Sequence, residues 1–177
     1  DMLNLFVSPN GTVASVCEWD EGGSNVAVFK DGKLISVPEG SGTGGWGRFS
    51  MASVVLDSNY VYQLLSQNGC DGANNELNQN GLPQFPPCMQ NQEWKVVRRY
   101  HISTGLAAPF AEGYGYQGDM LLVGRGSKRL LTGLAITDDE LFVCITDTAQ
   151  LKDSIKVYNK ASLKLVRQFE IGKGGGQ

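Results

Sequence analysis

A stretch near the C-terminal end of the chain, Leu134 to Gly172, has the pattern of four short β-strands joined by tight turns. An earlier stretch repeats this pattern. Val26–Lys30 corresponds to Ile155–Asn159, and Cys17 is expected at the place of Cys144. The two cysteines lie about three times a 40-residue repeat period apart. Such a repeat constrains the fold more firmly than local strand propensity does, because similar sheets must stack on one another.

The repeat divides the chain into three blades, at residues 3–39, 51–110 and 131–171, followed by a glycine-rich linker at 172–177. The second blade carries a polar insertion at 67–93, rich in Asn, Gln and Pro. Its last strand is expected at 106–110, with a further short strand at 120–123. We therefore expect an all-β fold, a β-propeller segment of about three four-stranded blades.

Three blades cannot close a ring, because propellers commonly contain four to eight blades. We therefore expect this segment to belong to a larger ring, with six blades as the expected number. The remaining blades come either from the same protein or from another copy of the chain. The glycine-rich linker favours the same protein, since it resembles a connector into a further blade.

The third blade resembles the NHL-type propeller repeat, a relative of the YWTD and gluconolactonase-like propellers. The resemblance is carried by Gly133–Val143, by Thr146-Asp147-Thr148, by Ser154–Tyr158 and by Leu163–Phe169. It is good over about 40 residues, fair over Leu3–Val37, and weak over the second blade. Repeats of this type occur in secreted propellers, in lyases and lactonases, and in interaction modules. The resemblance implies the blade and leaves the chemistry open.

Charge and hydropathy exclude some classes of function. The net charge is −3 and no basic block is present, which argues against nucleic-acid binding. No apolar run is long enough for a transmembrane helix. The N-terminus has neither the basic start nor the apolar core of a signal peptide. The chain is therefore either cytosolic or a trimmed product, and a start at Asp1 favours trimming.

Cys70 and Cys88 bracket most of the insertion and are predicted to form a disulfide. Closing a loop of about twenty residues contributes on the order of 3 kcal/mol in the loop-entropy model. The loop has too little apolar content to order itself, which favours a covalent link. The alternative is two free thiols in a cytosolic protein. The disulfide favours a secreted or periplasmic location. Cys17 and Cys144 are expected to be small buried core residues.

Aromatic residues in the connectors are the candidate ligand-binding residues. Trp46, Tyr114 and Tyr116 lie in glycine-rich segments, where their burial is not assured. Exposed aromatic rings beside polar side chains can stack on sugars or hold peptides. The alternative is that these rings pack between adjacent sheets.

Carboxylates near strand ends are the candidate metal ligands. Asp20 and Asp147, with Glu21 and Asp153 nearby, can supply oxygen ligands to Ca²⁺. The alternative is that each Asp caps its own turn. The sequence holds a single histidine, His101, so a histidine-clustered site is excluded within this chain.

We expect a binding or scaffold module for a protein or carbohydrate ligand, with no catalytic residue assigned and no cofactor beyond possible Ca²⁺. The alternative is a metal-dependent propeller enzyme, a lyase or lactone hydrolase, whose site is completed by residues outside this chain.

Overall fold

The computed structural model describes residues 2–18, 24–37, 49–67, 94–110, 120–125, 133–147 and 152–173. These ranges contain twelve strands and no helix, and therefore no helix that could cross a membrane. The strands form three four-stranded antiparallel sheets, and in each sheet neighbouring strands follow one another along the chain. This is the architecture of a partial β-propeller, and it confirms the all-β fold expected from the repeat.

Each sheet is one blade, numbered in chain order. Blade 1 consists of β1 (Met2–Val7), β2 (Val13–Glu18), β3 (Ser24–Lys30) and β4 (Lys33–Ser36). Blade 2 consists of β5 (Phe49–Leu56), β6 (Tyr60–Gln67), β7 (Trp94–His101) and β8 (Met120–Arg125). Blade 3 consists of β9 (Gly133–Ile136), β10 (Glu140–Asp147), β11 (Lys152–Asn159) and β12 (Leu165–Lys173).

The hairpin turns follow from local sequence. Asp31 and Gly32 connect β3 to β4, and both have positive φ angles, 51° and 72°. Two central residues with positive φ form the type I′ turn, whose twist matches that of the flanking strands. Asp-Gly is among the dipeptides that most favour this turn, so the local sequence explains the hairpin.

The outer strand of blade 2 differs from the prediction. The strand expected at 106–110 is wrong, because this segment makes only an isolated bridge between Tyr100 and Ala107. The fourth strand is instead β8, which pairs antiparallel with β7 and starts ten residues beyond the expected end of the blade at 110. The chain does turn back beside β7 here, because the N–H of His101 donates to the carbonyl of Leu106 at 2.9 Å and that of Ala108 to the carbonyl of Arg99 at 2.8 Å. This pairing stops after Ala108, and β8, which contains the short strand expected at 120–123, continues along β7 from Arg98.

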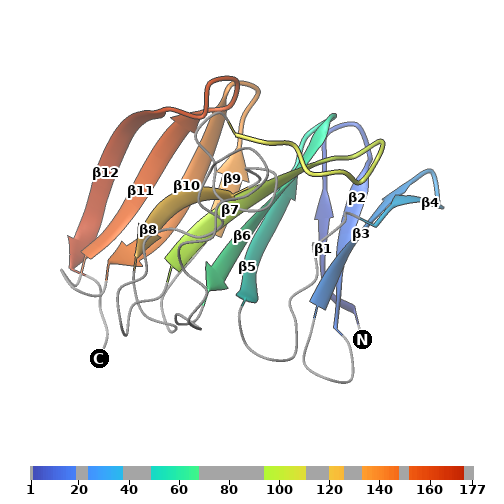
Figure 1. Ribbon diagram of the computed structural model, residues 1–177, viewed down its shortest axis with the longest axis horizontal. Coiled ribbons are helices and arrows are strands. Elements are labelled where there is room, and N and C mark those ends of the chain that lie inside the picture. The colour runs from blue at the N-terminus through green and yellow to red at the C-terminus, as the bar shows by residue number, and fades with distance from the viewer. Residues whose placement is uncertain are drawn as a thin grey trace, which may run out of the picture.

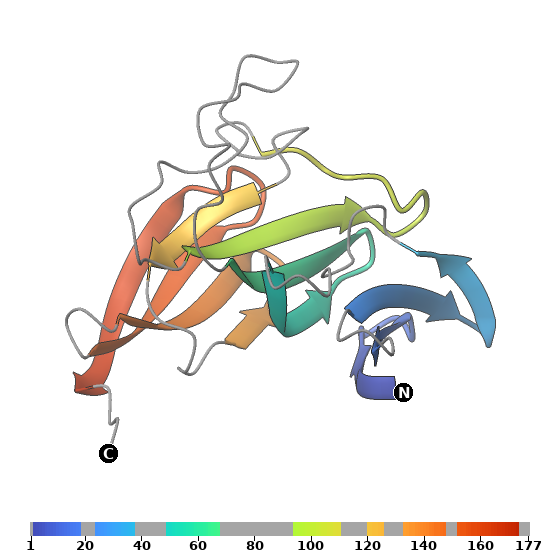
Figure 2. The same ribbon diagram turned by 60° about the horizontal axis from the view of Figure 1, so that its bottom comes forward.

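The three sheets stand side by side with their strands running in similar directions (Figures 1 and 2). The first strands of successive blades lie next to one another, β1 beside β5 and β5 beside β9. The last strands, β4, β8 and β12, lie at the outer ends of their sheets. Each blade therefore has a rear face, turned toward the preceding blade, and a front face, turned toward the next.

Two apolar cores fill the spaces between the blades. Between blades 1 and 2, the core consists of Ala14, Val26, Val28, Val54, Leu56, Val61 and Ile102. Between blades 2 and 3, it consists of Tyr62, Leu64, Val97, Val123, Leu141, Val143, Ile145 and Tyr158. Strand β6 contributes to both, because successive side chains point to opposite faces and both faces are covered. Residues 61–65 are accordingly all buried.

Strand register corrects one predicted correspondence between blades. Val13 pairs with Phe29 in blade 1, and Leu141 pairs with Tyr158 in blade 3, which aligns these two pairs. Cys17 pairs with Asn25 four positions further along and therefore corresponds to Ile145. The expected match of Cys17 with Cys144 is off by one residue, which in a strand exchanges the two faces. The match of residues 26–30 with 155–159 is confirmed.

Candidate functional site

One edge of the three sheets gathers the ends of equivalent strands. The last residues of β2 and β6 pair with the first residues of β3 and β7, Glu18 with Ser24 and Gln67 with Trp94. In blade 3, Asp147 pairs with Lys152 in the same way. The arrowheads of β6 and β10 mark this edge at the bottom of Figure 1. We call it the loop edge, because segments 19–23, 68–93 and 148–151 connect the strands there.

The predicted site residues stand in different relations to the loop edge. Asp147 is the last residue of β10 and lies on this edge. Asp20 and Trp46 lie outside the described residues, but each is within three positions of a strand end at this edge, Glu18 or Phe49. Phe49 pairs with Gln67, which fixes its place. Asp20, Trp46 and Asp147 are therefore all close in sequence to the same edge.

Asp153, the second residue of β11, pairs with Thr146 next to the loop edge. The remaining predicted residues lie outside the described ranges. Cys70 and Cys88 belong to segment 68–93, so their disulfide stays a prediction. Tyr114 and Tyr116 lie between Phe110 and Met120, and Met120 pairs with Arg98 toward the opposite edge. The two tyrosines are thus not flanked by loop-edge residues, unlike Trp46. Within the described ranges no three His, Cys, Asp or Glu side chains cluster, and the calcium prediction remains untested.

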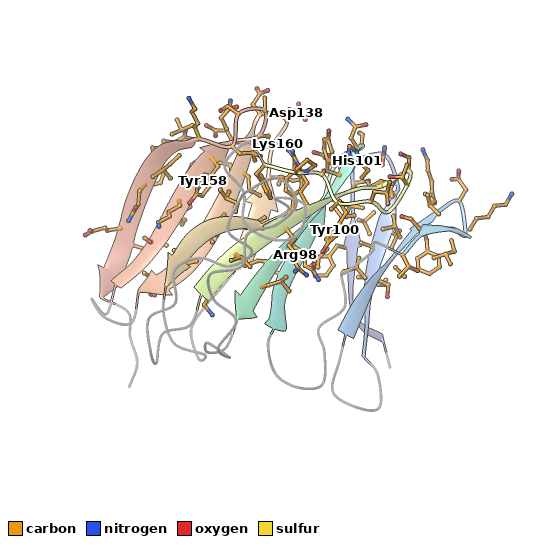
Figure 3. The ribbon with its side chains drawn as sticks, viewed as in Figure 1. Arg98, Tyr100, His101, Asp138, Tyr158 and Lys160 are labelled. Carbon is orange, nitrogen blue, oxygen red and sulfur yellow. The ribbon has the colours of Figure 1, made fainter. Side chains whose placement is uncertain are left out.

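The opposite edge, which we call the turn edge, holds a polar link between blades 2 and 3. Asp57, in the β5–β6 turn, accepts hydrogen bonds from the backbone N–H groups of Asn59 and Tyr60, both at 2.8 Å. Its other oxygen lies 2.7 Å from Nζ of Lys160, which follows β11 in blade 3. Lys160 also donates to the carbonyl of Thr137 at 3.0 Å. Figure 3 shows Lys160 and Asp138 on this edge of blade 3, and His101 at the same edge of blade 2.

Aromatic rings surround a guanidinium beside this link. The Arg99 guanidinium carbon lies 4.7 Å from the centre of the Tyr60 ring and 5.0 Å from that of Phe110. Arg99 also donates to the carbonyl of Pro109 at 3.1 Å, which holds segment 102–110 against β7. His101 also packs on Tyr60, with 5.0 Å between the centres of the two rings. Cation–π contacts of this kind contribute about 0.5–1 kcal/mol at exposed sites and more when desolvated.

Burial shifts the titration of the groups between the blades. It raises the pKa of Tyr62 to about 12, and the negative charge of Asp57 acts in the same direction. Burial alone raises the pKa of Tyr158 to about 12. For Asp57, burial raises the pKa, but the hydrogen bonds from Lys160, Asn59 and Tyr60 outweigh it and the net pKa is lowered. The turn edge is thus a fixed ion pair with neutral phenols beneath it, an arrangement suited to joining blades.

Sequence reasoning missed this cluster. Asp57-Ser58-Asn59 is readily recognised as a turn, but the partner of Asp57 lies about a hundred residues away and no local pattern points to it. His101, the single histidine, is half-buried with its ring against that of Tyr60.

Comparisons with known proteins add a fold-level likeness. No protein-family model matches the sequence, and no curated protein matches it. A solved structure with a similar arrangement is the acylaminoacyl peptidase of Pyrococcus horikoshii in its orthorhombic crystal form. It is 11% identical, with a TM-score of 0.46, over 97% of this chain and 25% of that chain. The chain thus spans a quarter of that structure's length, and at this similarity no function is carried across.

Proposed function

We propose that this chain is a scaffold module whose loop edge binds a protein or carbohydrate ligand. The observation that supports this most is the pairing of Glu18 with Ser24, Gln67 with Trp94 and Asp147 with Lys152. Three packed sheets thereby anchor three connecting segments on a single edge. Binding residues are commonly found on loops that a rigid scaffold positions in this way.

The segment 68–93 is the longest of these segments and the main proposed contact surface. Trp46 is proposed to stack on the ligand, since it is close in sequence to a strand end at the same edge. Asp20 and Asp147 are proposed to hold Ca²⁺ when it is present. A Cys70–Cys88 disulfide would restrain the segment, in keeping with a secreted or periplasmic location.

The loop edge can be tested by removing segment 68–93. Gln67 and Trp94 are directly paired, so an Asn-Gly turn can join them without disturbing β6 or β7. We expect the shortened protein to keep its melting temperature and to lose the ligands that the full chain retains on glycan and peptide arrays. Ser103→Ala, at an exposed position away from this edge, serves as the control and should bind normally. Unchanged binding by the shortened protein would refute the proposal.

Two further measurements address the proposed disulfide and the metal. Intact mass spectrometry with and without reductant, after alkylation, counts the free thiols and should find Cys70 and Cys88 linked. Metal analysis of the purified protein should show no tightly bound metal apart from exchangeable Ca²⁺. Stoichiometric Zn²⁺, or Ca²⁺ that survives dialysis against a chelator, would favour the metal-dependent enzyme instead.

A further inference from the structure

The residues on the rear face of blade 1 correspond to residues that form the interfaces of blades 2 and 3. No described sheet covers this face of blade 1. The pairs Val7–Val13, Leu56–Val61 and Ile136–Leu141 close equivalent hairpins in the three blades. Leu5, Val54 and Leu134 each lie two positions before the first residue of these pairs, and they therefore correspond to one another. The first strand of each blade thus carries two apolar residues on its rear face.

Exposure separates the covered copies of these positions from the open one. Val54 and Leu56 in blade 2 are 0% and 3% exposed, because the front face of blade 1 packs on them. Their counterparts Leu5 and Val7 in blade 1 are 54% and 66% exposed. Burying a side chain of this kind contributes about 1.5–3 kcal/mol. Leaving both in water is costly unless another surface covers them.

The front face of blade 3 is the complementary surface, on which Val157 is fully buried and Phe142, Cys144 and Ile155 are half-buried. Phe142 pairs with Val157, and Cys144 pairs with Ile155, at the positions that Tyr62 and Leu64 occupy in blade 2. Tyr62 and Leu64 pack on blade 3, whereas the front face of blade 3 meets no further described sheet. Phe169, which pairs with Ile155 on the outer strand, is 48% exposed.

A groove on the rear face of blade 1 fits this surface. It has a volume of about 510 Å³ and a mainly apolar lining that includes Leu5, Val13 and Phe29. Val13 and Phe29 correspond to Leu141 and Tyr158, which lie in the same core as Tyr62 of blade 2. A ring at the position of Phe142 would therefore meet Val13 and Phe29 in the same way.

The charges beside the two open faces are also complementary. Between blades 2 and 3, Lys160 from one turn reaches Asp57 in a turn of the preceding blade. The equivalent turn of blade 1 carries the exposed residues Lys30 and Lys33, with Asp31 between them. The equivalent turn of blade 3 carries exposed Asp138 and Asp139. Stacking blade 1 on the front face of blade 3 would bring these lysines toward these carboxylates.

We propose that the rear face of blade 1 docks on the front face of blade 3 of a second copy of this chain. Two copies related by a two-fold axis form both contacts at once and give a ring of six blades. Six lies within the range of four to eight blades in which propellers close, and the three blades described in one copy fall below it. The contact joins two different surfaces, so a ring that failed to close would grow into a filament.

The first test measures the mass of the purified chain by light scattering over a concentration series. We expect the mass of two chains, falling to one chain on dilution. Leu5→Glu should give one chain at every concentration with unchanged circular dichroism. Leu106→Glu is the matched control, because Leu106 is also a leucine, is 52% exposed, and lies on neither docking face. It should remain a dimer.

A complementation test identifies which faces meet. Phe169→Glu should also be a single chain, since it alters the front face of blade 3. Mixing it with Leu5→Glu should restore a dimer, weaker than the parent by at least tenfold in Kd, because one intact interface remains in the mixture. If Leu5→Glu fails to fold, Phe169→Glu alone still has to abolish the dimer. A parent that is a single chain throughout, a filament, or a Phe169→Glu dimer would each overturn the proposal.

Discussion

Substituting Asp57 separates the two tasks that its carboxylate performs at the turn edge. One oxygen accepts two backbone N–H groups within its own turn, and the other faces Lys160 across the blade interface. Asp57→Ala removes both tasks. Losing the hydrogen bonds within the turn costs about 1 kcal/mol, and a partly buried lysine without its carboxylate costs about 1–3 kcal/mol. We expect a total loss of about 2–4 kcal/mol in the free energy of unfolding.

Asp57→Asn separates the turn hydrogen bonds from the ion pair. Its carbonyl oxygen still accepts the two N–H groups, while the charge that faces Lys160 is gone. We expect it to cost about 1–2 kcal/mol, measured by denaturant titration. Lys160→Met, made in the parent and in the Asp57→Asn protein, completes a double-mutant cycle. The coupling energy between the two side chains should be about 1 kcal/mol. Equal losses for Asp57→Asn and Asp57→Ala would refute the role of the turn bonds. A coupling energy of zero would refute the role of the ion pair.

The same carboxylate predicts a pH dependence. Its pKa is lowered in the folded protein, so the unfolded chain binds its proton at a higher pH than the folded one does. The stabilisation is therefore complete above the ordinary aspartate pKa of about 3.9. It is lost as the pH falls through the lower, folded value. The stability difference between the parent and Asp57→Asn should shrink over that acidic range and stay constant near neutral pH.

Three further predictions test the packing between blades. A Cβ on Gly124 would lie 2.6 Å from Cδ1 of Ile145, so Gly124→Ala should cost about 1–3 kcal/mol in denaturant titrations. Ile145→Val removes that atom, and adding it should reduce the cost of Gly124→Ala; independent, additive losses would contradict this contact. Val61→Ala should cost about 1–3 kcal/mol, because Val61 is fully buried between blades 1 and 2, whereas an unchanged stability would mean that this core is not formed. The pKa values of Tyr62 and Tyr158 are raised to about 12, so the unfolded chain loses its phenolic protons first and stability should fall as the pH rises from 10 to 12. Tyr62→Phe should flatten this fall in a series of denaturant titrations, and an equally steep fall would argue against a buried Tyr62.

The sequence was sufficient for the architecture because its signals are local and repeated. Alternating apolar residues and turn pairs such as Asp31-Gly32 placed β3, β4 and most other strands correctly. It placed a short strand at 120–123, inside β8, but did not identify it as the outer strand of blade 2, because residues 106–108 come first along the chain and begin to pair with β7. The register of Cys17 was also misjudged, because a one-residue difference between turns leaves no trace in composition.

The candidate sites were less accessible to sequence reasoning. Asp147 was placed at a strand end, and the shared edge of β2, β6 and β10 follows from the topology. The link between Asp57 and Lys160 depends on how blades 2 and 3 stack, which no local pattern encodes. The open faces show the same limit, because Leu5 and Val54 are similar residues in similar strands and only the assembled sheets distinguish their surroundings.

Strand β6 has covered faces on both sides and paired strands along both of its edges. A backbone amide there reaches water only when two neighbouring sheets separate together, whereas amides of β4 and β12 need only the fraying of a single rim strand. Deuterium should therefore enter the molecule from its rims, and the amides of residues 61–65 should be the last to exchange. The slowest of these amides would report the free energy of global unfolding.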